Sequence, residues 1–269
     1  MDNATDLTQK AHRSHTYNFY QFLPWLIPLA LILMWQVAGS LNWLATDLVP
    51  TPWAVLQDGV SLWQSGELPK NLGISLYRAL MGFALGGSVG FFFGMLNGLS
   101  KTARGLFDST IQMLRNIPHL SLIPVVIILF GIGEAAKISL VTVGVMFPIY
   151  INTFHGITSV DPELIEMGQA YGLSKREMLT KIVFPGALPT ILVGIRYALG
   201  VMWTTLIVAE TISSNSGIGY MATNAQEFMD MKTVLLCIVI YALLGKASDL
   251  IAKLLEEICL DWQTERSHA

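Results

Sequence analysis

The chain has 269 residues, of which 53% are hydrophobic and 13% are charged, and its formal net charge is −3. A typical soluble domain contains roughly 25% charged residues, so this composition excludes an ordinary soluble protein and predicts an all-α integral membrane protein. The small net charge gives no indication of a nucleic-acid partner.

Six apolar runs are long enough to cross a bilayer, which takes about 20 residues of α-helix. They begin near Phe22, Leu72, Leu106, Ile138, Ile191 and Val234. We therefore predict six transmembrane helices in one domain at residues 22–255, between an N-terminal tail (1–21) and a C-terminal tail (256–269). The first run is too long for the apolar part of a signal peptide, so we expect it to persist as a membrane helix.

The second run contains a row of glycines at four-residue spacing: Gly82, Gly86, Gly90, Gly94 and Gly98. Each step of four residues advances about 40° around an α-helix, so the glycines form a slowly winding stripe. Such a stripe lets another backbone approach closely. We predict close helix packing here, and a substrate role or a sliding seam is the alternative.

The third run contains the polar sequence Arg115-Asn116-Ile117-Pro118-His119. Pro118 interrupts the helical hydrogen bonds and frees a carbonyl group, which Asn116 or His119 could satisfy in a kinked span. Arg115 is harder to place, since an intramembrane charge costs at least about 2.5 to 3.5 kcal/mol and usually faces a cavity or a partner. Two interpretations stay open for Arg115: a place on a substrate pathway, or a structural pairing with another helix.

The polar segment at residues 161–189 carries the signals of two short helices. Asp161 is a suitable N-cap, and Pro162 suits the first turn because its missing N–H costs nothing there. Gly172 then ends this helix, and Ser174 with Glu177 has the spacing of a capping box for a second helix. We predict a compact elbow at Gly172, with an ordinary helical hairpin between spans as the alternative.

The fifth run places Arg196, Gly200, Trp203, Ile207 and Glu210 on one face of a helix. Arg196 and Glu210 lie about 21 Å apart along the helix axis, so each requires its own partner or water. Arg196 is close enough to the predicted inner end of the helix to extend to the membrane interface. Glu210 precedes a polar, glycine-containing turn that suits an outer mouth or gate, although turns between spans are often merely polar.

Lysine and arginine residues divide unequally between the two sets of connections. One set, with the two termini, carries Lys10, Arg13, Lys101, Arg104, Lys175, Arg176, Lys181, Lys246, Lys253 and Arg266. The other set carries only Lys70, Lys137 and Lys232. The positive-inside rule therefore predicts that both termini and the 161–189 segment are cytoplasmic.

The sequence shows no catalytic residues and no site for a cofactor. Its one Gly-Lys pair, Gly245-Lys246, lacks the glycine and the hydroxyl residue of a phosphate-binding loop, so ATP must be bound by another protein. The five histidines form no i,i+4 pair, which gives no support for a metal site. Cys237 lies within the last run and Cys259 beyond it, so no disulfide is indicated. We predict a non-enzymatic subunit.

The spacing within the 161–189 segment resembles the cytoplasmic coupling loop of ABC importer permeases. That loop reads E-A-A-x-x-x-G, nine residues, then I-x-L-P; this chain has the same spacing but departs from it at Met167, Gly168 and Phe184. The resemblance implies that the loop contacts an ATPase through Glu166, Met167, Gly168, Gln169, Ala170, Tyr171, Gly172, Ile182 and Pro185.

From Pro24 to about Trp262 the chain is similar to permease subunits of the nitrate, sulfonate and taurine class of bacterial importers. Residues 112–119, 147–153 and 208–213 most resemble aliphatic sulfonate permeases. The resemblance implies a type I (MetI-like) ABC importer fold in the inner membrane, with six transmembrane helices and a cytoplasmic coupling helix. It also implies a homodimer, two cytoplasmic ATPase subunits that use ATP and Mg²⁺, and an extracytoplasmic binding protein.

The implied mechanism is alternating access, in which the coupling loop passes ATPase movements to the spans. An anionic sulfonate favours basic or hydrogen-bonding groups on its path. Candidate pathway residues are Arg115, Asn116, His119, Arg196, Trp203, Thr204, Thr205 and Glu210. Nitrate, taurine or another small solute is the alternative substrate.

Two other classes of protein stay open. A secondary transporter needs ion-coupling carboxylates near the midplane, whereas the only acid well inside a predicted span is Glu210, near its end. A membrane scaffold that transports nothing would need neither the capped elbow nor the intramembrane arginines.

Overall fold

The computed structural model describes residues 26–41, 43–45 and 48–260. Every regular element in these ranges is helical, which confirms the all-α prediction for them. A helix at Leu26–Ser40 is followed by α2 (Pro52–Gln64), α3 (Glu67–Leu99), α4 (Lys101–Arg115), η1 (His119–Leu122), α5 (Ile123–Phe130), α6 (Glu134–Thr158), α7 (Pro162–Ala170), α8 (Lys175–Met178), η2 (Leu179–Val183), α9 (Phe184–Ser213), α10 (Ile218–Glu227) and α11 (Met231–Cys259).

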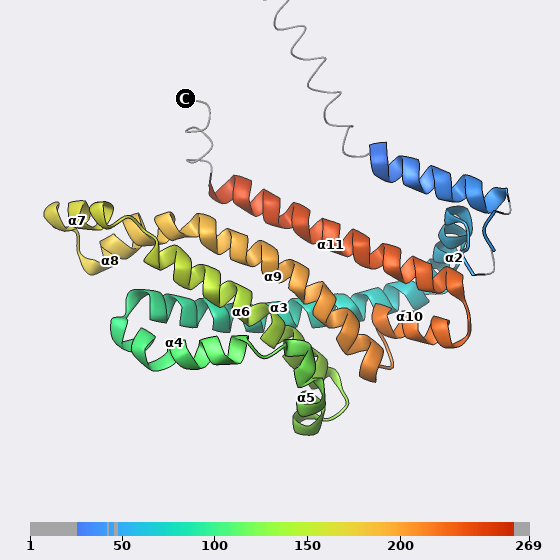
Figure 1. The fold of residues 1–269 in the computed structure, drawn as a ribbon, viewed down its shortest axis with the longest axis horizontal. Coiled ribbons are helices and arrows are strands. Elements are labelled where there is room, and N and C mark those ends of the chain that lie inside the picture. Colours follow the sequence, from blue (N-terminus) through green and yellow to red (C-terminus); the bar gives the residue numbers. More distant parts are fainter. Residues whose placement is uncertain (1–25, 42, 46–47, 261–269) are drawn as a thin grey trace, which may run out of the picture.

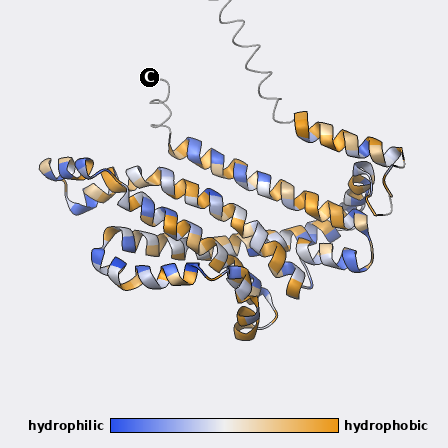
Figure 2. Ribbon diagram, viewed as in Figure 1, coloured by the Kyte–Doolittle hydropathy of each residue, from blue (hydrophilic) through white to orange (hydrophobic). Residues whose placement is uncertain are grey.

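Four long helices pack in the order α3, α6, α9, α11 and run along the length of the molecule (Figure 1). Each is long and apolar enough to cross a membrane, and α8, η2 and α9 together form one candidate span at Lys175–Ile212. Hydrophobic residues extend along these helices and over the projecting α5 (Figure 2). Many of these side chains are exposed on the outside of the bundle. Apolar surface of this extent is rare on soluble monomers and suits contact with lipid.

The glycine stripe of α3 packs directly against α6. A Cβ atom added at Gly86 would overlap the carbonyl oxygen of Thr142, and one added at Gly90 would overlap that of Met146. The other glycines of the stripe also face α6: Gly82, Gly94 and Gly98. A backbone carbonyl cannot move aside as a flexible side chain can, so the two helices are this close only because the stripe is glycine. The predicted close packing is confirmed.

The third predicted span is two helices rather than one. α4 is bent by 87° relative to the η1–α5 segment, so the break at Pro118 is much sharper than the expected kink, and whether the pair makes one span stays a prediction. Pro118 ends the first part because it cannot donate to a helical carbonyl, and Pro124 begins a new helix from the first turn of α5. Two prolines close together therefore turn the chain where one would kink it.

The described residues contain four candidate spans, or up to five if the bent pair counts as one. The apolar helix Leu26–Ser40 is shorter than these. It is tied to α2, since Gln36 Oε1 accepts a hydrogen bond from the Trp53 N–H at 3.0 Å. The first predicted span begins at Phe22, which lies outside the described residues.

The connections that we predict to be cytoplasmic gather at one end of the molecule. The α3–α4 turn, the α7–α8 segment and the C-terminal part of α11 lie toward this end, whereas α2 and α10 lie at the opposite one (Figure 1). We call these the inner end and the outer end. Which side of the membrane each one faces stays a prediction.

Candidate functional site

The 161–189 segment forms the two predicted short helices at the inner end (Figure 1). Asp161 caps α7, and Pro162 lies in its first turn. At the start of α8, Glu177 Oε2 accepts from the Ser174 N–H at 3.0 Å and Ser174 Oγ accepts from the Glu177 N–H at 3.3 Å, which is the predicted capping box. The bonds from Ser174, together with Lys181 at 3.1 Å, lower the pKa of the Glu177 carboxyl to about 2, so this group stays charged at neutral pH.

Gly172 makes the turn between these helices. Its φ is +73°, a value that L side chains rarely adopt. The Gly172 N–H donates to the Gln169 carbonyl at 2.9 Å, and the Leu173 N–H donates to the Gly168 carbonyl at 3.0 Å. This pair of bonds is a Schellman motif. The elbow is therefore held by its own backbone bonds and caps.

Most of the predicted coupling residues lie on the outside of the elbow. Leu164, Met167 and Tyr171 follow one face of α7 at i, i+3 and i+7, and Tyr171 is 80% exposed. Gly168 is buried instead, and a Cβ there would lie 2.7 Å from Ile182 Cδ1. The other predicted coupling residues are exposed or half-buried: Glu166, Gln169, Ala170, Gly172, Ile182 and Pro185. An exposed apolar stripe on a capped helix suits the groove of a partner protein.

The outer end holds a buried ionic network centred on Arg78, whose side chain has no exposed surface. It donates to Glu210 Oε1 at 2.7 Å, and to Glu134 Oε1 and Oε2 at 2.5 and 2.6 Å. Ser216 accepts two further bonds, through its carbonyl at 2.7 Å and its hydroxyl at 2.9 Å. All the guanidinium donors are therefore used, as a buried charge requires if it is not to destabilise the fold.

Glu210 is equally well bonded. Its carboxylate accepts from the Ser75 hydroxyl at 2.8 Å, the Gly219 N–H at 2.9 Å and the Tyr241 hydroxyl at 3.1 Å, besides the guanidinium. The turn after α9 folds back over it, so that a Cβ at Gly217, where φ is +107°, would overlap the carboxylate. The turn can therefore close over Glu210 because residue 217 is glycine.

Three residues of the predicted stripe on α9 bond to α11, whereas Gly200 is exposed. Arg196 pairs with Asp249 at 2.6 Å, and Trp203 Nε1 donates to Ser248 Oγ at 2.8 Å. Glu210 lies on the same side of α9 and also bonds to α11. Arg196 and Glu210 thus have separate partners, as their distance along the helix predicted. Because all three side chains are bonded within the chain, the geometry favours a structural role for them.

The remaining candidate pathway residues do not form one group. His119 Nε2 and Thr205 Oγ1 share a hydrogen bond of 3.0 Å. Thr204 is exposed and donates only to carbonyls of its own helix. Arg115 and Asn116 are exposed at the end of α4. The Leu114 carbonyl, which Pro118 cannot bond, accepts instead from the backbone N–H groups of Asn116 and Ile117. The assignment of these residues to a substrate pathway stays a prediction.

Arg78 is the partner of Glu210 that the sequence did not indicate, and Glu134 is a second partner of Arg78. Arg78 lies about 16 Å from the outer start of α3, whereas Glu210 lies about 5 Å from the outer end of α9. These distances from the helix ends therefore give no indication that the two residues pair. The structure brings them together because α9 stops short of the outer end, where α10 packs over it. The one available signal was that each is an intramembrane charge and needs a counter-charge.

No group of three or more His, Cys, Asp or Glu side chains in the described ranges could hold a metal ion. The two carboxylates of the outer network, Glu134 and Glu210, are both paired with Arg78.

Residues 86–257 match the family of binding-protein-dependent transport system inner membrane components, and the chain belongs to this family. A protein of Escherichia coli (strain K12) named as an aliphatic sulfonates transport permease, SsuC, is 53% identical over 89% of this chain and 91% of that protein. A protein of the same name from Bacillus subtilis (strain 168) is 42% identical over 88% of this chain and 86% of that protein.

The fold is shared with a solved ABC transporter. A chain in the crystal structure of a bacterial alginate ABC transporter, in complex with an alginate pentasaccharide-bound periplasmic protein, gives a TM-score of 0.57 at 16% identity. The match covers 95% of this chain and 97% of that one. Family and fold together define a multi-pass inner-membrane permease of an ABC importer, and members of this family are permeases rather than enzymes.

Proposed function

We propose that this chain is the transmembrane subunit of an ATP-driven importer that carries aliphatic sulfonates into the cell by alternating access. The observation that carries the proposal is the elbow at the inner end, a capped pair of short helices with an exposed apolar stripe. The names of the two relatives support aliphatic sulfonates as the substrate class.

The elbow has the properties of a coupling helix. Leu164, Met167 and Tyr171 present apolar surface next to the charged residues of α8, with 44%, 48% and 80% of these residues exposed. Aromatic and large apolar side chains of this kind supply most of the affinity when a helix binds in a groove. The partner is a cytoplasmic ATPase, because this chain has no phosphate-binding loop of its own.

A movement of the elbow reaches the outer end through one continuous helix. α8, η2 and α9 form a single helical segment at Lys175–Ile212, in which Lys175 and Glu210 lie about 50 Å apart. At its far end, Arg78 fixes this helix to α3 and to the start of α6. The outer ends of these three helices therefore move as a unit when the elbow is displaced.

The complete transporter contains two copies of this chain, two ATPase subunits that use ATP and Mg²⁺, and an extracytoplasmic binding protein. The family description and the alginate transporter complex support the binding protein. Each copy has six spans, in which the helix Leu26–Ser40 belongs to the first and the bent α4–α5 pair forms the third. Both termini and the 161–189 coupling loop lie in the cytoplasm, on the positively charged side.

The substrate class is tested by growth and uptake. A strain that lacks this chain should grow normally on sulfate but fail on ethanesulfonate as the only sulfur source, and the cloned gene should restore both growth and ATP-dependent uptake. A defect confined to nitrate as the nitrogen source, or to taurine as the sulfur source, would assign the other substrates of the class. Uptake by the purified chain in vesicles without any ATPase would identify a secondary transporter instead.

A further inference from the structure

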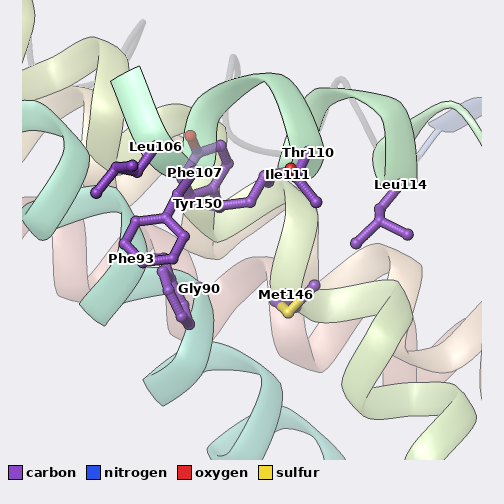
Figure 3. A pocket seen from close by; sticks show the side chains of 9 residues that line it. All are labelled: Gly90, Phe93, Leu106, Phe107, Thr110, Ile111, Leu114, Met146 and Tyr150. Carbon is purple, nitrogen blue, oxygen red and sulfur yellow. The ribbon is translucent and has the colours of Figure 1, made fainter. Parts of the chain in front are cut away.

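A cavity of about 470 Å³ lies between α3, α4 and α6 (Figure 3). α4 supplies most of its wall, with Leu106, Phe107, Thr110, Ile111 and Leu114. Gly90 and Phe93 of α3 and Met146 and Tyr150 of α6 form the opposite side. The lining is almost entirely apolar, and its volume far exceeds that of the small voids found in packed cores.

The cavity exists because α4 stands away from a tightly packed pair of helices. Behind it, α3 and α6 approach until Gly90 meets the carbonyl of Met146. In front, α4 is held by a chain of hydrogen bonds in which Asn97 donates to the Tyr150 hydroxyl at 2.9 Å and this hydroxyl donates to Asp108 at 2.9 Å. Phe107 packs edge-on against Phe93 of α3, with 5.7 Å between the ring centroids, and the rest of this apolar face of α4 borders the cavity.

The charged residues of α4 differ in how far they are engaged. Asp108 accepts the hydrogen bond from Tyr150, and Arg104 lies over the Phe154 ring at 4.8 Å. Arg115 directly follows Leu114 at the end of the cavity wall, is exposed, and forms no ion pair or side-chain hydrogen bond with any described residue. A free cation next to an apolar cavity is complementary to a molecule with an apolar chain and an anionic group.

We infer that this cavity receives the aliphatic chain of the transported sulfonate, with the sulfonate group at the Arg115 end. The inference rests on the proposed function and deepens it, because it assigns chain-length selectivity to the permease itself. Burial of one more methylene strengthens binding about fourfold. The cavity therefore favours long alkanesulfonates over short ones until it is filled.

The experiment compares uptake of ethanesulfonate and octanesulfonate by the complete transporter, with its own ATPase and binding protein, in cells. Thr110→Phe places a larger side chain in the cavity wall, and Ser109→Phe is the matched control, because Ser109 is exposed on α4 but does not line the cavity. Thr110→Phe should lower octanesulfonate uptake by on the order of tenfold, the loss of two buried methylenes or so, with ethanesulfonate uptake within about twofold. Ser109→Phe should leave the ratio unchanged.

Two further variants keep the test decisive. Leu114→Phe replaces Thr110→Phe if the latter fails to reach the membrane. Arg115→Ala should lower the uptake of both sulfonates by a similar factor, since it removes the cation that both use and leaves the cavity as it is.

The outcomes separate this inference from the proposed function. An unchanged ratio in the cavity variants, or an equal loss for both sulfonates, would overturn the inference, and the equal loss is the result expected if a lipid chain or a helix of the second copy fills the cavity. A wild-type transporter that takes up neither sulfonate would overturn the proposed function itself.

Discussion

At the outer end of the bundle, Arg78 and Glu210 are buried and fully paired within the chain, whereas at the inner end the elbow exposes its charges and an apolar stripe. The outer end is closed by side-chain bonds between segments that are distant in sequence. The inner end is closed by backbone bonds and caps within 20 residues or so. The first arrangement holds helices together, and the second leaves side chains free for a partner.

This difference predicts that variants at the two ends have different effects. A change to Arg78 or Glu210 should reduce the amount of folded protein, because it leaves the other residue of this pair buried and charged. A change on the elbow should leave the folded amount intact and impair coupling, because the elbow is exposed and supported locally.

The largest effect is expected from Arg78→Ala. It leaves Glu210 buried without its cation, which costs about 3 to 5 kcal/mol, so the protein should be strongly depleted from the membrane. Quantitative blotting of membrane fractions measures this. Lys70→Ala is the matched control on the same helix, because Lys70 is exposed. Normal abundance and thermal stability of the Arg78 variant in detergent would show that the network is not what holds the outer end.

Gly172→Val should come next. A β-branched residue at a φ of +73° is strained by about 1 to 3 kcal/mol, and the exposed elbow can relieve this strain by changing its shape. We expect membrane abundance near that of the wild type with uptake lowered by at least about tenfold. Normal uptake by this variant, with normal ATPase binding, would contradict a coupling role for the elbow.

Tyr171→Ala sharpens the comparison, because it removes surface without straining the backbone. If Tyr171 inserts into a groove of the ATPase, its truncation should weaken the association by about tenfold or more, as for other aromatic anchors. Titration of the detergent-purified chain with its ATPase measures the affinity. An unchanged affinity would place the contact surface elsewhere on the elbow.

The smallest effect is expected from Gly168→Ala, the residue that the resembled loop has at this place. The three atoms nearest to the added Cβ are Ile182 Cδ1, Met178 Cε and Met178 Sδ, near the flexible ends of two side chains. The gain in helix propensity of about 0.5 to 1 kcal/mol offsets their displacement. Uptake and abundance should both stay near wild type, and a loss as severe as that of Gly172→Val would show that the elbow does not tolerate even a methyl group at its buried face.

The parts of the fold that could be predicted from the sequence are those set by local signals. The Asp161 cap, the Ser174–Glu177 box and the Gly172 stop lie within one short segment and act on the backbone beside them. The glycine stripe is periodic, so its face on the helix followed from spacing alone, although the identity of α6 as its partner did not.

The parts that could not be predicted depend on contacts between distant segments. Pro118 indicated a kink, but the 87° bend needs Pro124 as well and a bundle that leaves room for α5 to project. Glu210 indicated an intramembrane charge, but its pairing with Arg78 depends on how far α9 extends beside α3. Which side chains meet across two helices is set by packing, and the pattern within one helix does not reveal it.

The most direct test measures how much ATPase the detergent-purified chain captures, in one variant of the inner end and one variant of the outer end. Replacement of Leu164, Met167 and Tyr171 by alanine should abolish capture at normal membrane abundance. Glu210→Gln keeps the size of the buried side chain but replaces one accepting oxygen by an NH2 group. Less protein should reach the membrane, and the protein that does should capture the ATPase as the wild type does. Equal capture by the elbow variant and the wild type would contradict the claim that the inner end is built to bind a partner.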